Sequence, residues 1–178
     1  MPGAGKTTVG RQLARRLGGE FIDLDALIEQ RVGEKIRAYF EAHGEDAFRE
    51  VEADALAALN AAGSAVLSTG GGIVLRQANR ATLRKLWTVV YLQSSPEELF
   101  RRLRHDTQRP LLQVANPLAK LRELYAQRDP LYRETAHFVI ETGRPSVAML
   151  VNMILMQLEL AGVVDAGHVP SPVQLPRG

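Results

Sequence analysis

The chain has 178 residues, 46% of them hydrophobic and 24% charged, which is typical of one soluble globular domain. Its net charge of +2 makes the pI of about 9.1 a weak indication of nucleic-acid binding. The lack of cysteine excludes disulfides and thiolate metal sites, and no apolar run reaches the ~18 residues of a transmembrane helix. We therefore expect a cytoplasmic protein that binds neither nucleic acid nor membrane.

Hydrophobic periodicity predicts short strands that alternate with helices. In chain order, the first half contains a helix at 9–17, a strand at 20–23, helices at 24–30, 36–43 and 47–59, and a strand at 65–68. The second half contains a helix at 79–86, a strand at 88–92, helices at 96–104 and 117–125, a strand at 137–141 and a helix at 147–160. This alternation predicts an α/β fold in which helices cover both faces of a parallel sheet.

No repeat or linker divides the chain, so we expect one domain over residues 1–161. Residues 105–116 lack periodicity and lie between two predicted helices, where a closing lid belongs. Residues 162–178 contain three prolines and are predicted to be a disordered tail.

The first eight residues, MPGAGKTT, contain most of a nucleotide-binding P-loop. Gly3 and Gly5 let backbone amides curl around phosphate oxygens, and Lys6 can reach the β- and γ-phosphates. The Thr7 hydroxyl is placed to ligate Mg²⁺, and the amides from Lys6 to Thr8 begin a helix, where anions are favoured. The alternative is an ordinary glycine turn before an amphipathic helix.

The P-loop pattern G-x-x-x-x-G-K-[ST] would place its first glycine one position ahead of Met1. A P-loop also normally follows a buried strand. We therefore expect that the chain as written lacks such a strand and is unstable or nearly inactive, and that about ten restored upstream residues rescue it.

Two further groups follow predicted strands. Asp23 and Asp25 are at positions i and i+2, so an extended strand end points both side chains the same way. Gly70, Gly71 and Gly72 follow the next strand. Ligands of parallel sheets bind at the carboxyl ends of strands, so we expect both groups near the P-loop. Alternatively, the acids stabilise a helix N-terminus and the glycines form a flexible loop.

Five more motifs follow the P-loop in order: FIDLD at 21–25, GEDAFREVE at 44–52, STGGG at 68–72, RPLL at 109–112 and RDPLY at 128–132. Together they resemble the shikimate kinase family from Gly3 to about Leu160. The resemblance implies a P-loop NTPase-like parallel sheet, similar to nucleoside monophosphate kinases, with a lid. It also implies that a monomer uses ATP and Mg²⁺ to phosphorylate the shikimate 3-hydroxyl in aromatic amino-acid biosynthesis.

The resemblance implies a role for each matching residue. The implied ATP-binding residues are Gly3, Ala4, Gly5, Lys6, Thr7, Thr8, Arg109 and Arg144, the last from a weaker match near the adenine. The implied shikimate-binding residues are Asp25, Arg49, Gly71 and Arg128, with Arg49 and Arg128 clamping the carboxylate. The implied catalytic residues are Lys6, Asp25 and Arg109, and the implied Mg²⁺ ligands are Thr7 and Asp23.

Taken singly, the arginines have simpler interpretations. Arg49 lies among acidic residues and could form a surface ion pair, and Arg128 could be a cation at a helix C-terminus. Arg109 could belong to an ordinary basic loop. Two other functions stay open: a P-loop kinase for a sugar acid or nucleotide, and a non-catalytic sensor domain related to shikimate kinase.

Overall fold

The structure is a computed structural model and describes residues 3–59, 64–103, 114–143 and 145–165. Arg109, Arg144, most of the predicted lid and the tail beyond residue 165 lie outside the described residues.

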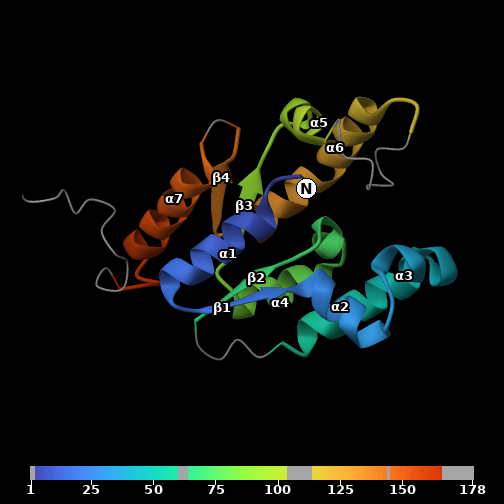
Figure 1. The fold of residues 1–178 in the computed structure, drawn as a ribbon, viewed down its shortest axis with the longest axis horizontal. Coiled ribbons are helices and arrows are strands. Elements are labelled where there is room, and N and C mark those ends of the chain that lie inside the picture. The colour runs from blue at the N-terminus through green and yellow to red at the C-terminus, as the bar shows by residue number, and fades with distance from the viewer. Residues whose placement is uncertain (1–2, 60–63, 104–113, 144, 166–178) are drawn as a thin grey trace, which may run out of the picture.

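Helices and strands alternate as the sequence predicts (Figure 1). The first half contains α1 (Lys6–Leu17), β1 (Glu20–Asp23), α2 (Leu24–Val32), α3 (Ile36–Ala57), β2 (Ala65–Ser68) and the 3₁₀ helix η1 (Gly71–Leu75). The second half contains α4 (Gln77–Leu86), β3 (Val90–Gln93), α5 (Pro96–Leu103), α6 (Pro117–Thr135), β4 (Phe138–Glu141) and α7 (Val147–Leu160).

The helices expected at 36–43 and 47–59 are confirmed as two helical segments of α3, divided at Gly44, whose backbone angles are non-helical (φ 82°, ψ 175°). One other helix differs from the prediction. The helix predicted to end at residue 125 continues to Thr135 through Pro130. Tyr132 and Thr135 are buried and continue its apolar face, so packing outweighs the hydrogen bond that proline removes.

The strands pair in parallel, in two separate pairs. β1 pairs with β2, with Phe21 opposite Val66, and β3 pairs with β4, with Leu92 opposite Ile140. In Figure 1, α1 runs through the middle of the view, with one strand pair on each side. Within the described residues, no strand joins β2 to β3, so the predicted single sheet is divided into two parallel halves.

A cavity of about 410 Å³ lies between the facing edges of β2 and β3, and we call it the inter-sheet groove. Its apolar lining includes Val66 and Leu67 from β2, Val90 and Leu92 from β3, and Leu13 from α1. One end of the groove reaches the P-loop lysine and the glycines that follow β2. The groove therefore extends from the gap between the two strand pairs to the edge where ligands are expected.

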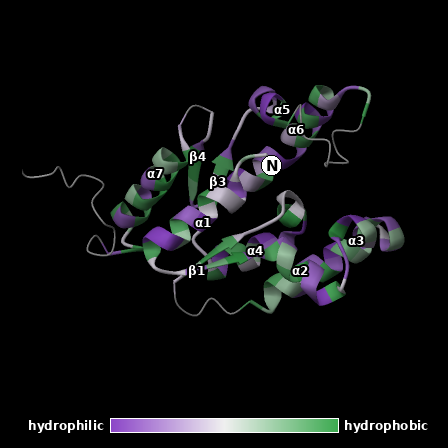
Figure 2. Cartoon of the chain, in the orientation of Figure 1, coloured by the Kyte–Doolittle hydropathy of each residue, from purple (hydrophilic) through white to green (hydrophobic). Residues whose placement is uncertain are grey.

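The helices bury their apolar faces against the strands and against one another. α1 packs on β1, β2 and α7, while α4 packs between α3 and α6. Figure 2 shows the strands as mainly hydrophobic and most helices as carrying both hydrophobic and hydrophilic residues. The largest fully buried apolar side chains are Leu24, Ile28, Leu56, Leu99, Leu121, Val151 and Leu155. Among the helices in the described ranges, none has the length and apolar character needed to span a membrane.

Candidate active site

The P-loop forms a tight turn into α1. Gly3 and Gly5 have φ angles of 75° and 80°, a left-handed conformation that side chains rarely adopt. The first backbone hydrogen bond of α1 runs from the Val9 amide to the Gly5 carbonyl, at 3.0 Å. Amides that precede the first helical bond have no acceptor inside their own helix, so they can bind an anion. The chain start therefore has the backbone geometry of a phosphate site.

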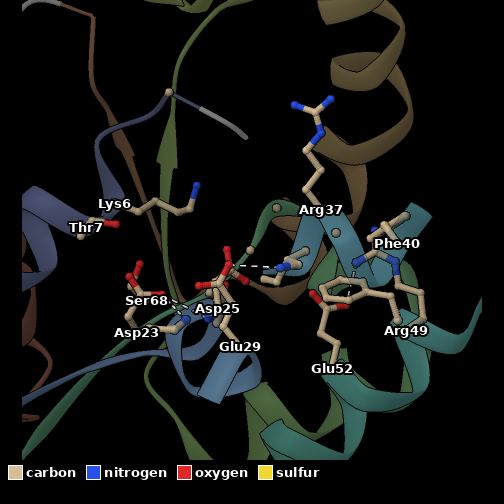
Figure 3. Close-up of a pocket in the computed structure, with 18 of the residues that line it drawn as sticks. Lys6, Thr7, Asp23, Asp25, Glu29, Arg37, Phe40, Arg49, Glu52 and Ser68 are labelled. Atoms are coloured by element: carbon tan, nitrogen blue, oxygen red, sulfur yellow. Dashed lines mark hydrogen bonds and ion pairs between the residues drawn. The ribbon is translucent and has the colours of Figure 1, made fainter. Parts of the chain in front are cut away.

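One large cavity joins the P-loop to the other predicted motifs. It has a volume of about 1220 Å³. The predicted site residues that line it are Gly3, Gly5, Lys6, Thr7, Thr8, Asp23, Asp25, Arg49, Gly71 and Arg128. Ala4 is buried beneath the turn and is not among the residues that line the cavity. In Figure 3, Lys6 and Asp25 lie on facing sides of the cavity, and Arg49 and Glu52 lie toward its α3 end.

Only one of the two aspartates has the extended geometry expected of a strand end. Asp23 ends β1 and caps α2, because its Oδ1 accepts hydrogen bonds from the amides of Asp25 (3.1 Å) and Ala26 (3.4 Å). Asp25 lies in the first turn of α2. The helix-capping alternative therefore holds for Asp23, yet both residues still line the cavity.

Burial, followed by the negative charge of Asp23, raises the pKa of Asp25 above its ordinary value. Lys6 and Arg49 act in the opposite direction by stabilising the carboxylate. A carboxylate with a raised pKa is a better proton acceptor near neutral pH. Asp25 can therefore both hold a hydroxyl group and take up its proton.

Arg49 is fixed on three sides. Its Nη1 donates to Glu52 at 2.8 Å, and its Nη2 donates to Glu45 at 3.1 Å. The guanidinium also lies over the ring of Phe48, 5.2 Å from the centroid. A Cβ atom at Gly72 would collide with this guanidinium, so a larger residue there would force the Arg49 side chain to shift. Arg49 is only 12% exposed, unlike an ordinary surface ion pair.

Glu52 is a site residue that the sequence analysis did not single out. Its side chain is 1% exposed and lines the cavity beneath Arg49. Burial raises the pKa of Glu52, while its hydrogen bond to Arg49 partly opposes that shift. The Arg49–Glu52 spacing of three residues on a helix is a signal that could have indicated this pair.

Arg128 lies well inside α6, so its interpretation as a helix C-terminal cation is wrong. Its Nε atom is buried and has no hydrogen-bond partner within the described parts of the chain. Buried donors are normally satisfied, so an unpartnered guanidinium nitrogen beside a cavity indicates a missing acceptor. Arg49 and Arg128 line the same cavity, where together they could hold a carboxylate.

The cavity also suits a magnesium ion bound together with phosphate. The Thr7 hydroxyl and the Asp23 carboxylate both line it. No group of three His, Asp or Glu side chains among the described residues could hold a metal alone. Mg²⁺ usually takes one or two protein ligands and fills its other positions with phosphate oxygens and water. Thr7 and Asp23 therefore fit such an ion.

Arg102 is a second residue that the sequence did not single out. Its guanidinium contacts the Thr142 carbonyl and approaches the Gly3 carbonyl at 3.5 Å. The Thr142 side chain forms a short, buried hydrogen bond with Ser94. Arg102 thus links the P-loop to the ends of β3 and β4. The signal in the sequence was the local run of arginines at the end of α5.

Comparison with known proteins agrees with this site. The family model described as shikimate kinase matches residues 2–159. Shikimate kinase of Paracidovorax citrulli is 57% identical over 97% of this chain and 93% of the relative. Shikimate kinase of Ralstonia nicotianae is 56% identical over 96% of this chain and 90% of the relative.

Solved structures agree as well. Shikimate kinase from Acinetobacter baumannii in complex with shikimate is 47% identical, with a TM-score of 0.84 over 92% of this chain and 90% of that chain. Shikimate kinase from Aquifex aeolicus is 29% identical, with a TM-score of 0.79 over 92% of this chain and 95% of that chain. By sequence and by structure, this chain belongs to the shikimate kinase family.

Proposed function

We propose that this chain transfers the γ-phosphoryl group of ATP to the 3-hydroxyl of shikimate, giving 3-phosphoshikimate and ADP for aromatic amino-acid biosynthesis. The observation that carries the proposal is the cavity that joins a P-loop to the half-buried carboxylate of Asp25 and to two arginines. We propose that the enzyme acts as a monomer. We place the enzyme in the cytoplasm.

The acceptor binds at the end of the cavity away from the P-loop. Arg49 and the unpartnered Nε of Arg128 hold the shikimate carboxylate, because guanidinium groups donate paired hydrogen bonds to carboxylates. Gly71 lies at the same wall and brings its backbone close to the acceptor. Asp25 then holds the hydroxyl that faces the phosphates.

The reaction depends on positioning and on charge. Asp25 orients the 3-hydroxyl and accepts its proton as the oxygen attacks the γ-phosphorus, and ADP leaves. Lys6 and the first amides of α1 stabilise the negative charge on the phosphates. Thr7 and Asp23 would hold Mg²⁺, which supplies further charge neutralisation.

The proposal extends to residues outside the described ranges on the basis of their motifs alone. Arg109 would stabilise the transferring phosphoryl group from the segment 105–116, and Arg144 would lie at the adenine. Residues 1–161 would then form the kinase domain, with 162–178 as its tail.

A coupled assay of ADP release tests the acceptor. We expect turnover with shikimate and little with gluconate or AMP, because shikimate holds its carboxylate and hydroxyls on a ring, whereas gluconate is an open chain and AMP has no carboxylate. The assay should use the 178-residue chain and a form that carries an N-terminal strand. Equal rates with all three acceptors would contradict the assignment.

The same assay separates the two alternative functions. A nucleotide kinase would prefer AMP, while a sensor domain would bind shikimate without releasing ADP. The half-buried Asp25 and the Lys6 that faces it support catalysis over sensing, since a sensor needs neither a proton acceptor nor a phosphate-binding lysine.

Substitutions of the three predicted arginines are expected to affect different substrates. Arg49→Ala or Arg128→Ala should raise the shikimate KM about ten- to hundredfold, because each loses a charge-assisted contact worth roughly 1.5–3 kcal/mol. Arg109→Ala should instead reduce turnover or ATP use. Arg37→Ala is a useful control, since Arg37 lines the cavity but pairs with the exposed Glu41. An Arg128→Ala variant that weakens only ATP binding would refute the assigned role.

A further inference from the structure

Tyr132 connects two parts of the shikimate-binding wall. Its hydroxyl donates a hydrogen bond of 2.6 Å to the Gly71 carbonyl, so it joins α6 to η1 across 61 residues of sequence. The Tyr132 side chain is 7% exposed. This hydrogen bond is partly buried, so losing the donor would be costly for the carbonyl, and the contact fixes the position of the glycine segment.

The same turn of α6 carries Arg128. Arg128 and Tyr132 are four residues apart and therefore lie on the same face of the helix. The positive charge of Arg128 acts directly on the Tyr132 hydroxyl, and it also acts on the buried Glu52 beside Arg49. The Tyr132 hydroxyl, the Arg128 guanidinium and the carboxylate that anchors Arg49 thus belong to one cluster.

Pro130 makes this turn of α6 depend on outside contacts. Proline has no amide hydrogen, so the helix lacks the backbone hydrogen bond from residue 130 to the carbonyl of Ala126, close to Arg128. The ring of Tyr132 packs on that of Tyr91, with centroids 4.8 Å apart, and its hydroxyl contacts Gly71. These contacts hold the turn where the helix itself is weakened.

We propose that Tyr132 is a positioning residue for shikimate: its hydroxyl bond to the Gly71 carbonyl sets the distance between the glycine segment and Arg128, so that both meet the acceptor at once. The inference rests on the proposed function. It assigns the tyrosine of the RDPLY motif a role in acceptor binding, in addition to its place in the core.

The Tyr132 hydroxyl stays protonated, and so remains a hydrogen-bond donor, over the pH range of an assay. Burial raises the pKa of Tyr132, and the nearby Arg128 only partly offsets this effect. The hydrogen bond to the Gly71 carbonyl therefore persists near neutral pH. The effect of removing it on shikimate binding should not change between pH 6 and 8.

Tyr132→Phe tests the proposal because it removes only the hydroxyl and keeps the ring contact. We expect the shikimate KM, and the Kd from a calorimetric titration, to rise about two- to tenfold, as for the loss of one hydrogen bond. The ATP KM and kcat should stay within about twofold of wild type. A purely structural role would lower the melting temperature without this selective change.

Tyr91→Phe is the matched control. Tyr91 is 6% exposed, and its hydroxyl donates a hydrogen bond of 2.9 Å to Asp129 of α6. The substitution removes this bond, as Tyr132→Phe removes the bond to Gly71. We expect a similar fall in melting temperature with an unchanged shikimate Kd. An unchanged shikimate Kd in Tyr132→Phe, or an equal rise of the Kd in both variants, would overturn this inference but not the proposed function. A wild-type chain that binds no shikimate would overturn the proposed function with it.

Discussion

Asp25→Asn is expected to lower the turnover of shikimate about 100- to 10,000-fold, the usual contribution of a positioned general base. The amide has nearly the same size as the carboxylate and can still contact the acceptor hydroxyl. It cannot accept the proton or carry the negative charge that orients the hydroxyl. The shikimate Kd should therefore change much less than kcat, which single-turnover measurements and titrations would separate.

The stability of the Asp25→Asn variant gives an independent check. A carboxyl group whose pKa is raised by folding contributes stability that is present below its unfolded pKa and is lost as the pH rises through its folded pKa. At pH 7 the wild-type chain therefore carries the cost of a partly buried charge, and the variant does not. Thermal melts should show the variant as equally or more stable at pH 7, with its advantage shrinking toward pH 4.

Glu29→Gln is the matched control for Asp25→Asn. Glu29 lies one turn further along α2, lines the same cavity and also loses a negative charge on substitution. Its carboxylate pairs with Lys35 at 2.8 Å. We expect turnover within about twofold of wild type. Wild-type turnover in Asp25→Asn, or an equal loss in Glu29→Gln, would remove Asp25 from the mechanism.

The sequence predicted much of this site because its motifs follow strand ends. Lys6 and the glycines after β2 could be assigned to one edge of a parallel sheet, where α/β proteins bind ligands. The extended geometry expected for both aspartates holds for Asp23, which ends β1 and caps α2, but not for Asp25, which lies in the first turn of α2. A capping acid and an acid at a strand end look the same in a sequence.

The parts that could not be predicted depend on packing between distant segments. Arg128 looked like the end of a helix because Pro130 follows it, and only the buried Tyr132 and Thr135 show that α6 continues. Glu52 could be read as a surface acid until its burial beneath Arg49 was known. Local patterns indicate a residue's chemistry, whereas its partners come from contacts such as Tyr132 to Gly71.

The second large effect concerns the inter-sheet groove. An extension of about ten residues ahead of Met1, with five or six apolar strand-forming residues leading into the P-loop, is expected to raise the melting temperature by at least about 10 °C. Each fully buried aliphatic side chain contributes roughly 1.5–3 kcal/mol, and each kcal/mol shifts the melting temperature of a domain this size by about 2–4 °C. Two or three such residues give that shift.

The groove has the features that a parallel strand needs. The edges of β2 and β3 face it, and apolar side chains from α1, α4 and α7 close its sides. A strand between them would pair on both edges and make one sheet of the two halves, supplying hydrogen-bond partners to exposed backbone groups. A P-loop is the turn that connects such a strand to its helix.

Filling the groove should also strengthen ATP binding, because Lys6 lies where the groove meets the active-site cavity. A strand that enters the turn at Gly3 would hold the P-loop from both sides and so preorganise its amides for phosphate. The control is an extension of equal length in which serine and glycine replace the apolar residues. It should leave both the melting temperature and the ATP Kd unchanged. If the apolar extension behaves like this control, the groove does not accept a strand, and the two halves of the sheet are stable as they are.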